Sequence, residues 1–311
     1  MSPVEARKVT PGTAKVASMD VWPLNSPLPK LIETTDTPGR VAGQLRVVTM
    51  LQMRGLAGKR VLVSGGTSGI GLATAVRFLE EGASVFVAGL DRAELDAALG
   101  VLRQHGRVWG IACDVSQEAD VVAMVAAAKE ALGNVDVLIN NAGTATRQPF
   151  LSITADQWDQ IIAVNLRGMF LVAQTVAKNM VARGSGVIIN MSSVNGIGGE
   201  EGYAHYNASK SGVLLLTKTM SAELGRHGIR VNALCPGYIR TPLNAAIAAG
   251  LSAHDPGGEP FDQVYARERI PLGRPGEPEE VAAAYAFLAS DDASFIHGTG
   301  LIIDGGQMAV M

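Results

Sequence analysis

The chain has 311 residues, of which 47% are hydrophobic and 18% charged, a composition typical of a soluble globular protein with one large α/β domain or two smaller ones. Its formal net charge is −3 and its basic residues are spread along the chain, which argues against nucleic acid and membrane surfaces as partners. The longest apolar run, residues 121–128, is much shorter than the ~18 residues of a membrane span.

Cysteine and histidine usage indicates a reducing compartment and no metal site. Cys113 and Cys235 both adjoin apolar runs, which favours buried free thiols, and therefore a cytoplasmic protein, over a disulfide. The five histidines form neither an HExxH pattern nor a cluster with the cysteines, so we expect no catalytic zinc.

The first 52 residues differ from the rest of the chain. They hold six of the 14 prolines and show no sustained helical or strand period. They lack the apolar core of a secretory signal, and their prolines oppose a helical presequence. We expect residues 1–52 to be a flexible or loosely attached extension, and residues 53–311 to be one domain. An untranslated leader, with Met53 as the true start, is the alternative.

From Arg60 onward, short apolar runs that end near glycine alternate with segments of helical period. This alternation predicts a Rossmann-type, doubly wound α/β domain: a parallel sheet of about seven strands with helices on both faces. A long stretch between residues 237 and 278 is expected to be irregular. Strands are predicted at residues 61–66, 83–89, 107–115, 135–143, 185–193, 229–237 and 300–306, and helices at 70–82, 94–106, 118–133, 154–184, 205–228 and 278–290.

A glycine-rich loop, SGGTSGIG, joins the first predicted strand to the first helix. Gly65, Gly69 and Gly71 give the pattern G-x-x-x-G-x-G. A turn without side chains lets backbone N–H groups and the helix N-terminus approach a pyrophosphate, so the loop predicts dinucleotide binding. A plain glycine-rich turn is the alternative for this pattern taken alone.

Several motifs occur in a fixed order after this loop: CDV, NNAG, VNLRG, NMSS, YNASK and CPGYIRTP. Over residues 55–308 the chain resembles the short-chain dehydrogenase/reductase family, with Ser64 as a departure where that family usually has threonine. The resemblance implies an NAD(P)-dependent oxidoreductase that acts on CH–OH groups, in a catalytic domain that assembles as a homotetramer or homodimer.

The resemblance also implies the cofactor contacts. Asp114 would contact the adenine ring, Asn141 would line the cofactor groove, and Thr241 would lie near the nicotinamide amide. Asp114 alone could equally be a helix N-terminal acid, and Asn141 a turn former. The full expected set is Gly65, Thr67, Ser68, Gly69, Ile70, Gly71, Asp114, Val115, Asn141, Ala142, Gly143, Tyr206, Lys210, Pro236, Gly237, Ile239 and Thr241.

The second strand bears on the choice between NAD and NADP. At its end a carboxylate usually accepts hydrogen bonds from the 2′-hydroxyl of NAD, whereas an arginine favours the 2′-phosphate of NADP. Here these positions are Gly89 and Leu90, followed by Asp91 and Arg92, and the glycine loop carries no basic residue. A 2′-phosphate would lack a compensating charge. We therefore expect NAD, unless Arg92 reaches back to a phosphate.

The stretch YAHYNASK, Tyr203–Lys210, carries the expected proton donor. Tyr206 and Lys210 are four residues apart and share one helix face, so the ammonium can lower the pKa of the phenol. Tyr203 lies two turns from Lys210, about 10.5 Å of rise, and is expected outside the helix. His205 is about 100° around the helix from Tyr206, so we expect it to face elsewhere.

Two further residues complete the expected catalytic set. Ser193 lies 13 residues before Tyr206, the spacing of the family, and is expected to hold the substrate oxygen. Ser192 would point to the opposite face of the strand. Asn165 lies inside a predicted helix, where asparagine is unfavourable. By the resemblance it would hold a water that relays protons through Lys210; a satisfied buried amide is the alternative.

The predicted irregular segment, residues 243–274, corresponds in the family to a mobile lid over the substrate. It begins with no cluster of basic residues, and a small polyol, sugar or hydroxy-ketone fits it. The interpretation is a secondary-alcohol dehydrogenase or ketone reductase. The alternatives are a 3-oxoacyl-[acyl-carrier-protein] reductase and, in another class, a non-catalytic dinucleotide-binding regulator.

Overall fold

The computed structural model describes residues 53–252 and 259–310. These residues fall within one compact unit, Thr49–Met311. The extension expected at residues 1–52 lies outside the described residues.

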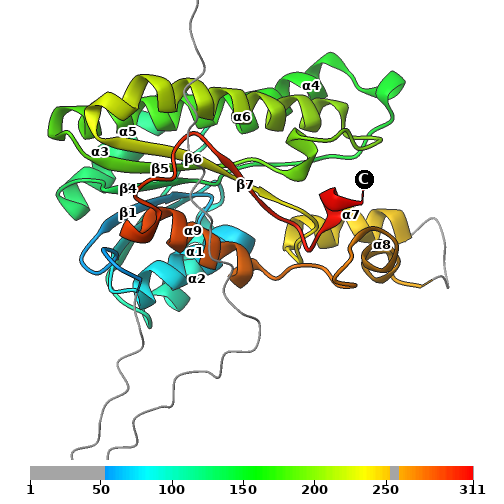
Figure 1. The fold of residues 1–311 in the computed structure, drawn as a ribbon, viewed down its shortest axis with the longest axis horizontal. Helices are drawn as coiled ribbons and strands as arrows, with labels where there is room; N and C mark the ends of the chain where they lie inside the picture. The colour runs from blue at the N-terminus through cyan, green and yellow to red at the C-terminus, as the bar shows by residue number, and fades with distance from the viewer. Residues whose placement is uncertain (1–52, 253–258, 311) are drawn as a thin grey trace, which may run out of the picture. The chain divides into compact units, whose positions relative to one another are not determined.

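The described part of the chain contains one sheet of seven parallel strands (Figure 1). The strand order β3-β2-β1-β4-β5-β6-β7 puts β1 between β2 and β4. The chain therefore winds outward from β1 first in one direction and then in the other, which confirms the predicted doubly wound sheet. The strands are β1 Arg60–Ser64, β2 Ser84–Gly89, β3 Val108–Ala112, β4 Val137–Asn140, β5 Gly186–Met191, β6 Ile229–Pro236 and β7 Gly300–Ile303.

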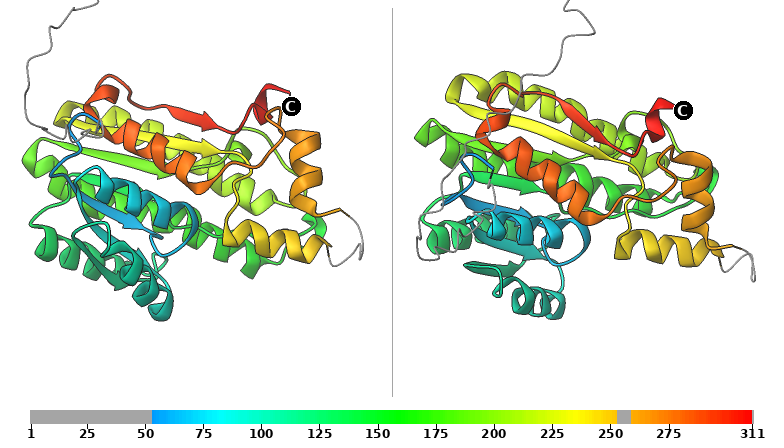
Figure 2. Two further views of the ribbon diagram at one scale, coloured as in Figure 1. Left: turned by 90° about the horizontal axis from the view of Figure 1, so that it is seen from below. Right: turned by 60° about the horizontal axis from the view of Figure 1, so that its bottom comes forward.

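Helices cover both faces of this sheet. α1, α2 and α9 lie on one face, and α3, α5 and α6 lie on the other (Figures 1 and 2). The crossovers thus place each helix against the strands that flank it, as parallel pairing requires. The helices are α1 Gly69–Glu80, α2 Arg92–Leu102, α3 Glu118–Leu132, α4 Ala155–Ile162, α5 Met169–Arg183, α6 Ala204–Leu224, α7 Pro242–Ser252, α8 Phe261–Arg269 and α9 Pro278–Ala289.

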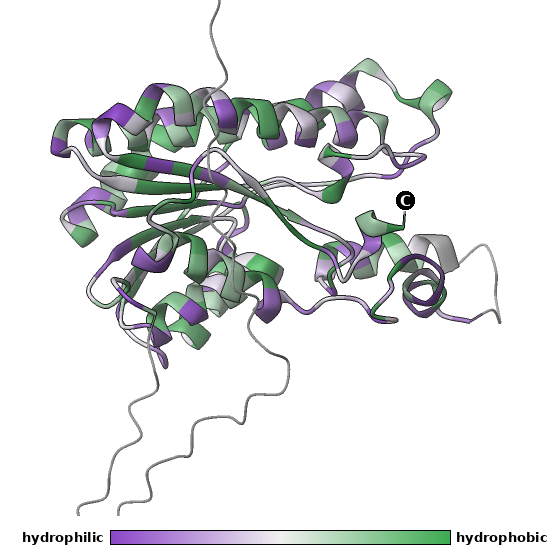
Figure 3. Cartoon of the chain, in the orientation of Figure 1, coloured by the Kyte–Doolittle hydropathy of each residue, from purple (hydrophilic) through white to green (hydrophobic). Residues whose placement is uncertain are grey.

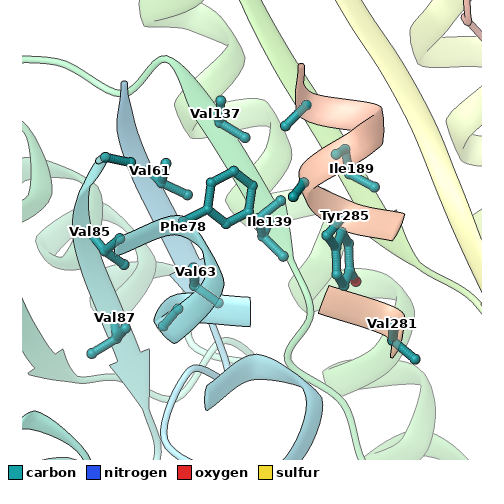
Figure 4. Close-up of a cluster of buried hydrophobic side chains, with 14 of the residues drawn as sticks. Val61, Val63, Phe78, Val85, Val87, Val137, Ile139, Ile189, Val281 and Tyr285 are labelled. Carbon is teal, nitrogen blue, oxygen red and sulfur yellow. The ribbon is translucent and has the colours of Figure 1, made fainter. Parts of the chain in front are cut away.

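Two apolar layers hold the sheet between the helices. In the first, Phe78 of α1 and Tyr285 of α9 pack on Val63 and Ile139 of the central strands (Figure 4). The second layer lies under α3 and α5. The central strands carry mostly hydrophobic residues, as the hydropathy colouring shows (Figure 3), because both of their faces are covered, whereas the edge strands β3 and β7 are partly exposed. Both cysteines are buried free thiols.

One helical stretch has the length and hydropathy of a membrane span. α4, a π-helical turn at Ala163–Gly168 and α5 run unbroken over the 29 residues Ala155–Arg183, and an 18-residue window within them has a mean hydropathy of 1.3. Counting only uninterrupted apolar runs in the sequence missed this stretch, because polar residues are interspersed along it. Half of that window is buried inside the fold, and Val172 and Met180 pack beneath the sheet. It is the core helix of a globular domain.

The segment expected to be irregular contains two helices, α7 and α8. The expectation gave too much weight to its Gly and Pro residues: α7 has the sequence PLNAAIAAGLS, and alanine is the strongest helix former. Both helices lie beyond the carboxyl ends of the strands, beside the C-terminus (Figure 1). The family lid was expected to be mobile, and its residues 253–258 lie outside the described residues.

Candidate active site

A cavity of about 450 Å³ opens at the carboxyl ends of the central strands. The strand register aligns these ends: Ser64 of β1 is paired with Asn140 of β4, which is paired in turn with Asn190 of β5. This is where doubly wound sheets bind ligands, because the strand order reverses there. Every residue expected to contact the cofactor lines the cavity, Tyr206 and Lys210 included, and so does Ser193.

The glycine loop fits a pyrophosphate. Gly65 and Gly69 adopt positive φ angles of 65° and 50°, which favour glycine. A Cβ at Gly71 would lie 1.8 Å from the carbonyl oxygen of Gly65, so no side chain fits there. The N-terminus of α1 follows directly, with no acidic residue in its first turn. Free backbone N–H groups and the helix dipole together suit a dianion.

Ser64 holds the loop against β4. Its Oγ accepts hydrogen bonds from the backbone N–H groups of Asn141 at 3.1 Å and Ala142 at 3.2 Å, and lies 3.3 Å from Oδ1 of Asn140. Asn141 Nδ2 donates back to the Gly65 carbonyl at 2.9 Å. The hydroxyl makes these contacts without a methyl group, so serine serves where the family usually has threonine.

The end of the cavity that lies beside α2 carries acidic residues. Asp91 caps α2, accepting from the backbone N–H of Glu94 at 2.8 Å, and Glu94 itself lines the cavity. Arg92 Nε donates to Asp96 at 3.1 Å, so it is paired along its own helix. Gly89 packs against Thr67, since a Cβ on Gly89 would lie 2.2 Å from the threonine methyl.

Asp114 lies at the wall of the same end of the cavity. Its carboxylate accepts from the backbone N–H of Ser116 at 2.9 Å, and its own N–H donates to Asp120 at 3.1 Å. Both contacts order the turn after β3, which fixes where the carboxylate stands relative to the cavity.

Tyr206 and Lys210 lie one turn apart on α6. The Nζ atom of Lys210 is 5.5 Å from the centroid of the Tyr206 ring and donates to the Met191 carbonyl at 3.0 Å. The Lys210 side chain is 2% exposed. Tyr203 directly precedes the helix, as expected, and its ring contacts that of Tyr206 edge-on at 6.1 Å.

Burial shifts the pKa values of Tyr206 and Lys210 in the directions that favour their neutral forms. It raises the pKa of Tyr206 to about 12, against a smaller lowering by the hydrogen bond with Ser193. It lowers the pKa of Lys210 to about 8. The expected lowering of the Tyr206 pKa by Lys210 is therefore not seen in the protein alone. The Lys210 ammonium is itself desolvated and donates a hydrogen bond to the Met191 carbonyl.

The two serines at the end of β5 point in different directions. Ser193 meets the Tyr206 hydroxyl and also accepts from the backbone N–H of Asn195 at 3.1 Å. Ser192 donates to the backbone carbonyl of Lys210 at 2.9 Å, which connects the end of β5 to α6. This division follows from the alternation of side chains along a strand.

Asn165 stands behind the cavity wall, in the π-helical turn. It is fully buried, and its amide forms two 2.8 Å hydrogen bonds with the backbone of Thr144, accepting from N–H and donating to C=O. A Cβ at Gly143 would lie 3.3 Å from Asn165 Oδ1 and 3.5 Å from Lys210 Nζ. Asn165 and Lys210 therefore meet at Gly143, although Asn165 does not line the cavity.

His205 has a positioning contact that the sequence did not indicate. It is fully buried; Nδ1 accepts from the backbone N–H of Tyr206 at 3.0 Å, and Nε2 lies 3.0 Å from Thr146 Oγ1. Burial lowers the pKa of His205, which favours the neutral ring that this acceptor needs. His205 thus joins the start of α6 to the loop after β4.

Sequence reasoning also missed part of the cavity lining. Pro242, Leu243 and Asn244 belong to α7, which was not predicted, and the side chains of the others carry no distinctive chemistry that would single them out. The missed residues are Leu90, Glu94, Thr144, Gln160, Val164, Met191, Pro242, Leu243 and Asn244.

Residues 65–308 match the family described as Enoyl-(Acyl carrier protein) reductase. Levodione reductase of Leifsonia aquatica is 42% identical over 255 residues, which is 80% of this chain and 94% of that protein. The 3-oxoacyl-[acyl-carrier-protein] reductase of Thermotoga maritima is 39% identical over 252 residues, 81% of this chain and 98% of that one. The crystal structure of levodione reductase superposes with a TM-score of 0.77 at 39% identity, covering 82% of this chain and 99% of that one.

The fold and the glycine-lined cavity define a nicotinamide-dependent oxidoreductase that acts on CH–OH groups. Within that class, the chain belongs to the short-chain dehydrogenase/reductase family.

Proposed function

We propose that this protein interconverts a secondary alcohol and a ketone of the small polyol, sugar or hydroxy-ketone class, with Tyr206 as general acid and base. The observation that carries the proposal is that Ser193, Tyr206 and Lys210 line the same cavity as the glycine loop. A hydroxyl pair beside a dinucleotide cradle suits protonation of a carbonyl oxygen.

In ketone reduction, the bound nicotinamide supplies the hydride. Ser193 orients the substrate oxygen by a hydrogen bond, while Tyr206, whose pKa of about 12 keeps it protonated at neutral pH, delivers a proton to that oxygen. Lys210 stays mostly charged below its pKa of about 8 and favours the phenolate that remains. We assign Asn165 to the support of this relay through Gly143 and Lys210.

We propose NAD as the preferred cofactor. Asp91 and Glu94 make the adenosine end of the cavity acidic, which opposes a 2′-phosphate. Arg92, the cation that could reverse this preference, is paired with Asp96. Fluorescence titration with NADH and NADPH tests the choice; tighter binding of NADPH would contradict it.

A homotetramer or homodimer is the proposed assembly, in the cytoplasm. Large apolar side chains are exposed on α5, on α6 and on the edge strand β7: Phe170 is 40% exposed, Leu215 67% and Ile302 43%. Exposed apolar surface of this kind favours self-association. Sedimentation velocity measures the assembly directly.

A second candidate is reduction of a 3-oxoacyl-[acyl-carrier-protein], the reaction named for the Thermotoga maritima relative. An acidic carrier protein would need basic surface beside the cavity. A second cavity, lined in part by the loop after Ser193, carries both signs, with Arg147 and Arg269 among Glu200, Glu201 and Glu268. We therefore rank this candidate second; turnover of an acyl-carrier thioester at rates above those of small alcohols would reverse the order.

The test of the main proposal is a panel of secondary alcohols and ketones, read by nicotinamide absorbance. Tyr206→Phe should lose turnover while it still binds the cofactor, because only the proton donor is removed. Tyr285→Phe is the matched control, since that phenol lies in the core and its hydroxyl has no partner within the described residues. The assignment is wrong if Tyr206→Phe turns over like wild type while Tyr203→Phe does not.

A further inference from the structure

Four of the chain's five tyrosines gather at one side of the catalytic serine. Tyr203 lies in the loop before α6, Tyr206 in α6, Tyr238 in the loop after β6 and Tyr265 in α8; the fifth, Tyr285, is in the core. Aromatic residues make up only 5% of the chain. Their concentration on separate elements around one point is therefore a specific feature of this site.

Three of the aromatic rings at the lid pack against one another. Tyr238 and Tyr265 have ring centroids 4.9 Å apart, and Phe261 lies 6.3 Å from Tyr238 and 5.6 Å from Tyr265. Tyr203 and Tyr206 make a separate edge-on contact at 6.1 Å, and electrostatic interaction reaches from Tyr203 to Tyr238 and Tyr265. All of these side chains are half-buried, so each keeps part of its ring accessible.

A second cavity of about 390 Å³ adjoins this group. Phe261 and Tyr265 of α8 line it together with Met308, on the side opposite the loop after Ser193. Its volume is within the range of small-molecule sites. We call this cavity, with the aromatic group, the lid pocket.

Polar groups are placed at the edge of the lid pocket. The Glu200 carboxylate lines it and is oriented by Asn195, whose Nδ2 donates at 2.9 Å. Gln307, 4% exposed, lines it too, and its Nε2 donates to the Tyr265 hydroxyl at 2.9 Å. Aromatic faces with hydrogen-bonding groups at their edges match a ring that is apolar on its faces and hydroxylated on its rim.

We propose that the lid pocket is a substrate subsite for a ring, so that the enzyme acts on cyclic polyols or cyclic hydroxy-ketones in preference to open-chain ones. The proposal rests on the proposed function and narrows its substrate class. A rigid ring presents a flat C–H face to the tyrosine and phenylalanine rings, and it loses less conformational freedom on binding than an open chain. Glu200 accepts a hydrogen bond from a ring hydroxyl.

The test compares two substrates matched in size and chemistry, trans-1,2-cyclohexanediol and hexane-3,4-diol. Wild type should favour the cyclic diol in kcat/KM, and Tyr238→Leu and Tyr265→Leu should each reduce that preference by about fivefold, the loss of one ring contact. Tyr265→Phe keeps the ring and should keep the preference. Tyr285→Phe, outside both sites, should change neither rate.

Equal or better turnover of the open-chain diol by wild type would overturn the proposal, as would leucine variants that lower both rates in proportion. If neither diol is turned over, the panel of alcohols and ketones decides the proposed function separately, and binding of the two diols decides the subsite. In saturation-transfer NMR the cyclic diol should bind more tightly than hexane-3,4-diol, and Tyr265→Leu should abolish the difference. Equal binding of the two diols by wild type would refute the subsite.

Discussion

Replacing Lys210 with methionine should change the stability of the protein in a way that depends on pH. Folding lowers the pKa of this lysine from 10.5 to about 8, so the unfolded chain binds more protons than the folded one between these values. Stability of the wild type therefore rises with pH across that window. At pH 7 the buried ammonium costs roughly 3 kcal/mol, most of which is regained by pH 10.

Lys210→Met removes this dependence. Relative to the variant, the wild type should gain about 2–3 kcal/mol between pH 7 and pH 10, or about 2–4 °C in Tm per kcal/mol. The loss of the hydrogen bond to the Met191 carbonyl shifts the variant equally at all pH values, so it does not affect the slope. Thermal melts over this range measure the difference. Lys178→Met is the matched control, because that side chain is exposed on α5. A constant difference between wild type and Lys210→Met would refute the reasoning.

Three further variants test other parts of the structure. Gly71→Ala should abolish NADH binding in a fluorescence titration, since its Cβ would lie 1.8 Å from a loop carbonyl oxygen, whereas Gly100→Ala, with open space around it, should bind NADH normally. His205→Ala should lower kcat about tenfold and leave KM nearly unchanged, by loss of one positioning hydrogen bond; an altered KM alone would contradict that role. Arg60→Ala should cost about 1–3 kcal/mol at pH 7 in urea unfolding. Burial raises the pKa of Asp136 but hydrogen bonds from Arg60 outweigh it and hold this pKa below 3.8, so the cost should shrink as the pH falls below about 4. A cost that persists there would argue against the ion pair.

The elements that the sequence predicted well are those whose signals are local. The glycine loop, the strands and the i, i+4 spacing of Tyr206 and Lys210 depend on residues a few positions apart. The alternation of strands and helices predicted a parallel sheet with helices on both faces, which the structure confirms. Ser193 was distinguished from Ser192 by strand alternation and by the spacing of the family.

What the sequence did not reveal depends on contacts between distant segments. His205 meets Thr146, 59 positions away, so no local pattern indicates its role. The pKa of Lys210 depends on burial, which lies in the packing of α6 on β5 and not in the spacing to Tyr206. In the lid, the abundance of Gly and Pro obscured α7, which its alanines favour.

The contact between Gly89 and Thr67 limits how the cofactor preference of this enzyme can be engineered. The usual carboxylate at position 89 would meet the threonine methyl, because even a Cβ there lies 2.2 Å from it. A designer who introduces aspartate at this position must therefore shorten residue 67 in the same step, and the two substitutions should be strongly non-additive. Libraries that vary one position at a time would miss this pair.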